Sequence, residues 1–379
     1  MNTHTFQSES APVVKRQVKL KSILQSTGLD SLILNAGSSL TYLTGLNFHL
    51  SERPVLVIFT PDTTPMIVLP ELEQEKLKDL PYEMQAFKYG EDPSGWGAVF
   101  NWAIQVGKLD RKRNGIEPRQ LRVLEYSFLT EFATKAKFVP AGDVVSKLRM
   151  YKDESEIIAM RKAVKIAEQG LNATLPHIKI GLTEKELATE LTLQLFRAGS
   201  DPEMPFSPIV SAGLNSANPH AWPSERKLTS GDLLVIDWGA SHGGYFSDIT
   251  RTFAIGEVEP EFIQIGIIVL DANIAGRETA KPGIPMEAVD KAARAVIETA
   301  GYGKYFTHRT GHGLGMESHE EPYIRAGNTS LLEAGMAFTI EPGIYLPGRN
   351  GVRIEDDVII TSTGAECLTS LPREVVQLV

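Results

Sequence analysis

The chain has 379 residues, a length that favours two domains over one. Its formal net charge of −9 leaves no basic excess to neutralise phosphates, which argues against a dedicated nucleic-acid binder. Cys367 is the only cysteine, so internal disulfides and thiolate metal sites are excluded. The N-terminal segment lacks the apolar core of a signal peptide, and no long apolar run follows. We therefore expect a cytoplasmic protein that does not enter a membrane.

The first part of the chain predicts a small domain of alternating helices and strands. Residues 1–13 lack periodicity and are expected to form a flexible tail, and residues 14–148 to form an α/β domain with a mixed sheet. No catalytic pattern is found there. The expected helices are 18–25, 72–80 and 96–106, and the expected strands are 31–35, 55–59 and 66–69.

Residues 149–379 predict an α+β domain built on an antiparallel sheet. An amphipathic helix begins near Ser155, and a second helix is expected to follow Thr183, with Glu186 completing a capping box. Strands dominate afterwards and are interrupted by two helical stretches. The strands are expected near 209 and at 233–238, 245–253, 336–345 and 352–360, and the helices at 262–279 and 286–300.

The first informative segment is LLVIDWGASHGGYFSDITRTF, residues 233–253, which predicts a hairpin. A turn centred between His242 and Gly243 sets Asp237 opposite Asp248. Like charges that face each other inside apolar strands are destabilising unless they share a proton or a cation lies between them. This hairpin alone leaves two alternatives equally open. Either the two aspartates form a functional site, or the register is a coincidence and one Asp faces solvent.

The pattern recurs in residues 336–360, where a turn near Gly348 sets Glu341 opposite Glu355. Pro342 weakens this register because it cannot donate to the ladder. Of the two acids after Glu355, Asp356 and Asp357, one is expected to face outward and the other to serve in a turn or to support a ligand. Two facing carboxylate pairs favour a site for two divalent cations.

A neutral imidazole is the expected further ligand, and His312 is the best candidate. It stands between Gly311 and Gly313, so the backbone around it can approach a ligand closely, and His319 follows nearby. His220 lies in a proline-flanked loop, where a functional role and simple exposure are equally open.

Five residues and their flanking letters resemble the metal ligands of the "pita-bread" metallopeptidases: Asp237, Asp248 (SDITRTF), His312 (GHGLG), Glu341 (TIEPG) and Glu355 (RIEDD). This family includes methionine aminopeptidases, Xaa-Pro aminopeptidases and Xaa-Pro dipeptidases, or prolidases. The resemblance covers about residues 152–371. The preceding domain resembles the creatinase-type N-terminal domain of the proline-specific members, which methionine aminopeptidases lack. The resemblance thus implies an α+β pita-bread domain on a curved antiparallel sheet, preceded by a smaller α/β creatinase-type domain, in a cytoplasmic homodimer.

The resemblance also implies roles for these five residues. Asp237 would bind one ion in bidentate fashion, His312 and Glu341 would bind the other, and Asp248 and Glu355 would bridge the two. Two such cations share a water, lower its pKa and polarise the scissile carbonyl. Glu341 would accept the proton of that water and pass it to the leaving proline nitrogen.

Other residues enter through their match to the family or their nearness to ligands. His220 and His319 match the two outer histidines, which would stabilise the tetrahedral oxyanion. Oxygen-rich ligation with one imidazole suits Mn first, with Co, Fe and Zn as alternatives. Residues within three positions of a ligand are expected to orient the carboxylates: Tyr245, Thr250, Thr339 and Arg353.

The expected substrate is a short proline-containing peptide. Some prolidases place an arginine four residues after the second outer histidine, to bind the substrate carboxylate. Here Tyr323 stands at that position, and the candidate replacements are its hydroxyl and Arg325, Arg349 and Arg373. Size and architecture favour an Xaa-Pro dipeptidase, with an Xaa-Pro aminopeptidase acting on longer peptides as the alternative. A binding module or a non-peptidase hydrolase or lyase is disfavoured, because all five ligand positions are intact.

Overall fold

The computed structural model describes residues 11–379, and the chain divides into two units, Met1–Arg149 and Met150–Val379. The division falls beside the boundary predicted between residues 148 and 149. Within residues 11–379, no helix combines the length and the apolar composition needed to cross a membrane.

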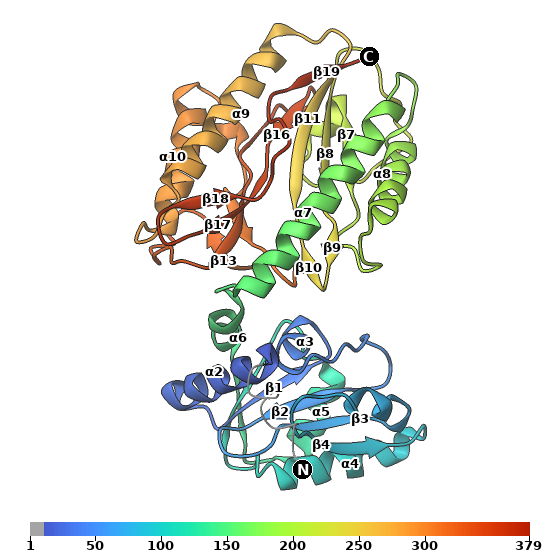
Figure 1. Ribbon diagram of the computed structural model, residues 1–379, viewed down its shortest axis with the longest axis vertical. Coiled ribbons are helices and arrows are strands. Elements are labelled where there is room, and N and C mark those ends of the chain that lie inside the picture. The colour runs from blue at the N-terminus through green and yellow to red at the C-terminus, as the bar shows by residue number, and fades with distance from the viewer. Residues whose placement is uncertain (1–10) are drawn as a thin grey trace, which may run out of the picture. The chain divides into compact units, whose positions relative to one another are not determined.

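The first unit is a mixed six-stranded sheet with helices on both faces (Figure 1). The strand order is β4-β3-β2-β1-β5-β6, in which β2 is antiparallel to both neighbours and the other pairings are parallel. Its strands are β1 Ser31–Asn35, β2 Leu56–Phe59, β3 Met66–Pro70, β4 Gln85–Tyr89, β5 Arg113–Ile116 and β6 Lys137–Pro140. Its helices are α2 Pro12–Thr27, α3 Ser38–Thr44, α4 Trp96–Val106, α5 Val123–Phe132 and α6 Gly142–Arg149, with 3-10 helices η1 Glu71–Leu77 and η2 Pro93–Gly95.

Apolar side chains explain why this sheet is covered on both sides. Strands β1, β2 and β3 are buried at every residue, as strands between two helical layers must be. Phe100 of α4 and Leu129 of α5 pack with Ile33 of β1 on one face. The mixed sheet is thereby confirmed.

Some local predictions for this unit are corrected. The predicted tail lies mostly outside the described residues, but Pro12 and Val13 belong to α2, where proline suits the first turn of a helix. The helix expected at 72–80 is the 3-10 helix η1. Strands β5 and β6 were not predicted, because their sequences, RNGI and KFVP, are only four residues long and show no alternation of apolar and polar residues.

The second unit contains two larger sheets with a pair of helices beside each, and two short two-stranded sheets (Figure 1). The four-stranded sheet has the order β19-β11-β8-β7 and the five-stranded sheet β13-β12-β14-β17-β18; every pairing is antiparallel except β11 with β19. Its strands are β7 Ile209–Ala212, β8 Asp232–Trp238, β9 Ser241–His242, β10 Tyr245–Phe246, β11 Ile249–Ile255, β12 Gly311–Gly313, β13 Glu320–Ile324, β14 Ala337–Ile340, β15 Gly343–Tyr345, β16 Gly351–Arg353, β17 Asp356–Ile360, β18 Ala365–Cys367 and β19 Val376–Leu378. Its helices are α7 Glu154–Thr174, α8 Glu184–Ala198, α9 Pro260–Thr279 and α10 Met286–Thr299, with 3-10 helices η3 Leu175–His177, η4 Gly213–Ala217 and η5 Gly303–Tyr305.

The helices of this unit begin where the chain supplies caps and pack through apolar faces. Thr183 and Glu186 form the predicted capping box of α8. Leu191 of α8 and Ala167 of α7 pack with Ile236 of β8. Helix α10 packs on β14 and β17 of the five-stranded sheet, and α9 packs with β8, β11, β15 and β16. The predicted α+β class is confirmed for this unit.

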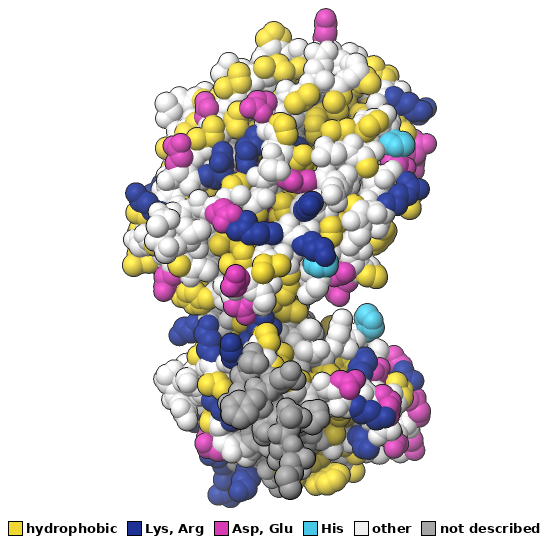
Figure 2. Space-filling model, in the orientation of Figure 1, with side chains coloured by type: hydrophobic (Ala, Val, Ile, Leu, Met, Phe, Trp, Pro, Cys, Tyr) yellow, Lys and Arg dark blue, Asp and Glu magenta, His cyan; other side chains and the backbone are white. Residues whose placement is uncertain are grey.

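Basic and acidic side chains are interspersed over the face that Figure 2 shows. The described residues on this face therefore form no continuous basic strip.

Candidate metal centre

The turn between β9 and β10 fixes where the first aspartate pair meets. Gly243 and Gly244 both adopt positive φ, +60° and +77°, which glycine tolerates and a two-residue turn between right-twisted strands requires. The turn is thus centred one residue later than predicted, and Asp237 lies opposite Thr250 rather than Asp248. Side chains alternate with period two, so this two-residue change of partner leaves Asp248 on the same face, diagonal to Asp237. The predicted register is wrong, but the predicted meeting of the carboxylates is found.

The second hairpin has the predicted register. The ladder is interrupted between two pairs: Ile340 pairs with Asp356 before the interruption, and Gly343 pairs with Arg353 after it. Glu341 therefore lies opposite Glu355. Pro342 interrupts the ladder here, as expected of a residue that cannot donate.

The two sheets meet at these carboxylates. An isolated bridge pairs Thr250 of β11 with Glu355, whose backbone N–H donates to the Thr250 carbonyl at 3.1 Å. Strand β12 carries His312 and packs tightly between β13 and β14. A Cβ on Gly311 would lie 1.8 Å from the Thr339 carbonyl oxygen, and one on Gly313 would lie 2.3 Å from Glu321 backbone atoms. Only glycine fits on either side of His312.

The five predicted ligands converge in three overlapping groups. Ligand atoms lie within 4.8 Å of one another in the group Asp237, Asp248 and Glu355, and again in the group His312, Glu341 and Glu355. A third group joins Asp248 and His312 to His319. His312 Nε2 lies 3.4 Å from Glu341 Oε1 and 3.7 Å from Asp248 Oδ2. Carboxylate oxygens with one imidazole are a donor set that fits divalent metal ions.

Two atoms of the cluster also favour cation binding. Asp237 Oδ1 is buried and has no hydrogen-bond partner, although buried polar atoms nearly always have one. His312 Nδ1 lies 3.2 Å from the Gly313 carbonyl oxygen, an acceptor only, so the proton sits on Nδ1 and the Nε2 lone pair is free. Burial and the neighbouring His319 lower the pKa of His312 well below its usual value, which keeps the ring neutral. Both atoms are therefore ready to bind a cation.

The carboxylates are electrostatically incomplete as they stand. Burial raises the pKa of Asp237. Burial, reinforced by the charge of Glu355, raises the pKa values of Asp248 and Glu341 well above the usual range. Burial and the charge of Asp237 raise the pKa of Glu355 to about 8. Positive charge between these carboxylates would lower their pKa values and favour the ionised forms.

Three of the four predicted supporting residues contact the ligands. Thr250 Oγ1 donates to Glu355 Oε2 at 2.7 Å and accepts from Arg353 Nε at 3.0 Å. The Arg353 guanidinium also donates to Asp237 Oδ2 at 2.6 Å. Thr339 Oγ1 accepts from the backbone N–H of His312 at 3.2 Å.

The structure does not give Tyr245 the predicted contact with a ligand carboxylate. Its hydroxyl donates to Glu156 Oε1 of α7 at 2.8 Å, so it anchors the helix rather than a ligand. Tyr245 belongs to β10, whereas Asp248 follows that strand, so closeness in sequence did not place the tyrosine hydroxyl beside the ligand.

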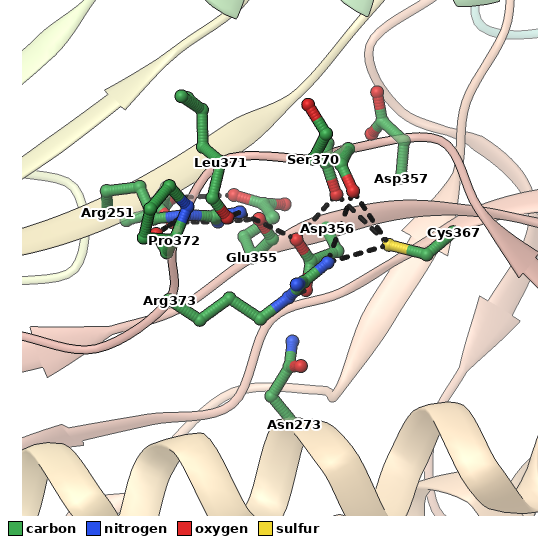
Figure 3. A network of polar contacts seen from close by, with 12 residues as sticks. Arg251, Asn273, Glu355, Asp356, Asp357, Cys367, Ser370, Leu371, Pro372 and Arg373 are labelled. Atoms are coloured by element: carbon green, nitrogen blue, oxygen red, sulfur yellow. Dashed lines mark hydrogen bonds and ion pairs between the residues drawn. The ribbon is translucent and has the colours of Figure 1, made fainter.

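Asp356 and Asp357 are both buried, so the prediction that one faces outward is wrong. Strand β17 lies between β14 and β18 and is covered on both faces. Asp357 accepts from the Asp248 backbone N–H, at 3.2 and 3.3 Å to its two oxygens. Asp356 lies between Arg251 and Arg373, as Figure 3 shows, at 2.9 and 2.7 Å, and accepts from Thr369 Oγ1 at 2.5 Å.

A cavity of about 610 Å³ opens over the ligand cluster, a volume within the usual range for small-molecule sites. His220 and His319 both line it, and the His319 ring lies 3.9 Å from the His312 ring. The lining also contains residues that were not predicted, among them His308 and Arg309. His308 Nδ1 lies 4.0 Å from Glu341 Oε2, and burial lowers the pKa of His308 to about 4. Its position four residues before His312 is the sequence feature that could have identified His308.

Comparison with known proteins agrees with this geometry. Residues 158–362 match the model of metallopeptidase family M24, and residues 16–151 match that of the creatinase/prolidase N-terminal domain. The chain is 34% identical to the Xaa-Pro dipeptidase of Lactobacillus delbrueckii subsp. lactis over 357 residues, 94% of this chain and 97% of that protein.

Solved structures resemble the whole chain. A recombinant prolidase from Thermococcus sibiricus has a TM-score of 0.92 and 34% identity, covering 97% of this chain and all of that one. An X-Pro aminopeptidase from Thermotoga maritima has a TM-score of 0.83 and 30% identity, covering 96% and 99%. The pita-bread fold with a creatinase-type N-terminal domain is thereby confirmed. The chain belongs to metallopeptidase family M24 and is a metallopeptidase.

Proposed function

We propose that this metallopeptidase is a dinuclear Xaa-Pro dipeptidase that hydrolyses short proline-containing peptides. The observation that carries the proposal is the convergence of three buried carboxylates and the partly buried Glu341 on one imidazole, with Asp237 Oδ1 left without a partner. The prolidase and Xaa-Pro dipeptidase relatives, which align over nearly the whole chain, support the substrate class.

The ligand groups support a division of the five residues between two ions. Asp237 would bind one ion through both oxygens, and His312 and Glu341 would bind the other. Asp248 and Glu355 belong to groups on both sides, as bridging carboxylates would. Thr250, Arg353 and Thr339 would orient these ligands through the contacts described. Mn²⁺ is our first choice, with Co²⁺, Fe²⁺ and Zn²⁺ as alternatives.

When bound, the two ions lower the pKa of a shared water and polarise the scissile carbonyl. The chain's own residues would then move the proton. Glu341 borders the cavity with 14% of its side chain exposed, against 6% for Asp248, and so can accept the proton and pass it to the leaving proline nitrogen. His220 and His319 line the same cavity and would donate hydrogen bonds to the oxyanion.

The alternative is an Xaa-Pro aminopeptidase acting on longer peptides. The absence of an arginine at position 323 and the likeness to the Thermotoga maritima enzyme favour it. The cytoplasmic location and the homodimer remain predictions from the sequence.

A rate comparison distinguishes the dipeptidase from the aminopeptidase. It uses Ala-Pro, Gly-Pro and Ala-Pro-Ala as substrates, with added Mn²⁺ or Co²⁺. We expect cleavage of both dipeptides and little turnover of the tripeptide. Preference for Ala-Pro-Ala would establish the aminopeptidase instead. No turnover of any of the three would refute proline specificity altogether.

A further inference from the structure

Two arginines line the cavity, and one of them is already committed to the metal centre. Arg353 donates to Thr250 and Asp237, and its remaining contacts are the Tyr345 hydroxyl and the Pro219 carbonyl. Its guanidinium therefore has little capacity left for a substrate.

Arg309 is different. Its guanidinium has one hydrogen bond, from Nη2 to His319 Nδ1 at 3.2 Å, and lies 4.4 Å from the centre of the Tyr323 ring. Among residues 11–379 it forms no ion pair with a carboxylate. An arginine has five N–H donors in a planar fork, so most of them remain available on the cavity side.

Arg309 lines the same cavity as the ligand cluster and is linked to it through one histidine. His319 contacts Arg309 through one ring nitrogen, and its ring lies 3.9 Å from that of His312. In an Xaa-Pro dipeptide, three bonds of about 1.3–1.5 Å separate the scissile carbon from the carboxylate carbon. The carboxylate therefore lies close beyond the scissile carbon, and a single imidazole, that of His319, lies between Arg309 and the His312 ring.

The structure also explains the tyrosine at position 323. The replacements predicted from the sequence lie elsewhere: Arg349 pairs with Glu259 and Glu261, Arg373 pairs with Asp356, and Arg325 is exposed and bonds to a backbone carbonyl. Tyr323 instead offers its ring face to Arg309, an arrangement that stabilises a guanidinium.

We infer that Arg309, held on the Tyr323 ring, binds the C-terminal carboxylate of the dipeptide substrate in place of an arginine at position 323. This inference rests on the proposed dipeptidase function and deepens it. Because an arginine can only donate, the contact also fixes the His319 tautomer. Nδ1 accepts, so the proton is on Nε2, available to the substrate.

The test compares two substrates that share one scissile bond. Ala-Pro carries a free carboxylate, whereas Ala-Pro amide does not. For Arg309→Met we expect kcat/KM on Ala-Pro to fall about 10- to 100-fold, chiefly through KM, as loss of a charge-assisted bidentate pair predicts. The amide should change by less than about 3-fold. Arg309→Lys should keep part of the preference, because a lysine supplies charge without the fork.

Arg325→Met is the matched control, an exposed arginine that we expect to be replaceable without effect on either substrate. Equal losses on Ala-Pro and its amide in Arg309→Met would overturn the inference and leave the dipeptidase intact. Calorimetric titration of the metal-loaded protein with L-proline and with L-prolinamide needs no turnover. Arg309→Met should weaken proline binding about 10-fold or more and leave prolinamide unchanged. Unchanged proline binding would overturn the inference even if the wild type failed to cleave dipeptides.

Discussion

Glu355 and Asp356 are chain neighbours, equally buried, and yet their carboxyl groups are in opposite electrostatic situations. Glu355 faces other carboxylates, and its pKa rises to about 8 through burial and the charge of Asp237. Burial also opposes ionisation of Asp356, but Arg251 and Arg373 outweigh it and hold the pKa of Asp356 below its usual value. Burial alone therefore does not decide whether a carboxylate is charged. On one face of the chain the protein supplies its own cations; on the other it requires them from solution.

The largest expected effect comes from removing a carboxylate on the face that requires cations. Asp248→Ala should abolish hydrolysis and tight binding of the second metal, because the proposed bridging position would have no other carboxylate to fill it. Metal content by mass spectrometry, together with the Ala-Pro assay, measures both. Asp271→Ala, an exposed aspartate on α9, is the control and should keep full activity. Full activity in a one-metal or metal-free Asp248→Ala protein would contradict the mechanism.

Removing the charge of Asp356, on the face where arginines supply the cations, should reduce stability. Asp356→Asn leaves Arg251 and Arg373 without their counter-charge, and breaking a buried pair typically costs about 3–5 kcal/mol of unfolding free energy. The matched control is Glu366→Gln, whose partner Arg161 is 44% exposed and whose loss should cost under about 1 kcal/mol. Chemical denaturation measures both. Equal destabilisation would mean that the Asp356 network is no stronger than a surface pair.

The metal-free protein should become less stable, relative to the metal-loaded one, as the pH rises. The site carboxylates have folded-state pKa values above their unfolded values, so their contribution is complete below about pH 4.5 and is lost as the pH passes through about 8 for Glu355. Each kcal/mol lost lowers the melting temperature by roughly 2–4 °C for a unit of this size. The melting-temperature difference between Mn²⁺-loaded and EDTA-treated protein should therefore grow from pH 5 to pH 9. A constant difference would show that the acids are not coupled to the ions.

The smallest effect is expected at a residue that only orients a ligand. Thr250→Val removes the hydroxyl that bonds Glu355 Oε2, and we expect metal affinity to fall about 10- to 100-fold. Thr250→Ser restores the hydroxyl and should restore affinity. A competition titration with a metal chelator measures the difference.

The sequence predicted the chemistry of this site better than its geometry. Asp237 and Asp248 were found through a register that is wrong by two residues, and the error did no harm because an even displacement preserves the face. The prediction for Tyr245 rested on closeness in sequence to Asp248, and its hydroxyl bonds instead to Glu156 of α7. His308 and Arg309 escaped because loop residues carry no periodicity, so only the folded chain brings them to the cavity. Long apolar strands such as β1 were predicted, whereas β5 and β6 depend on neighbours supplied by tertiary structure.

The two glycines around His312 have a consequence for interpreting natural variants of this chain. An alanine at position 311 or 313 leaves all five ligands and every charge in place, yet its methyl group would collide with the backbone of an adjoining strand. The strand carrying the imidazole would have to move, and ligand atoms tolerate displacements of only tenths of an ångström. Such a variant would resemble the loss of a ligand in every assay, although a search for missing ligands would find none.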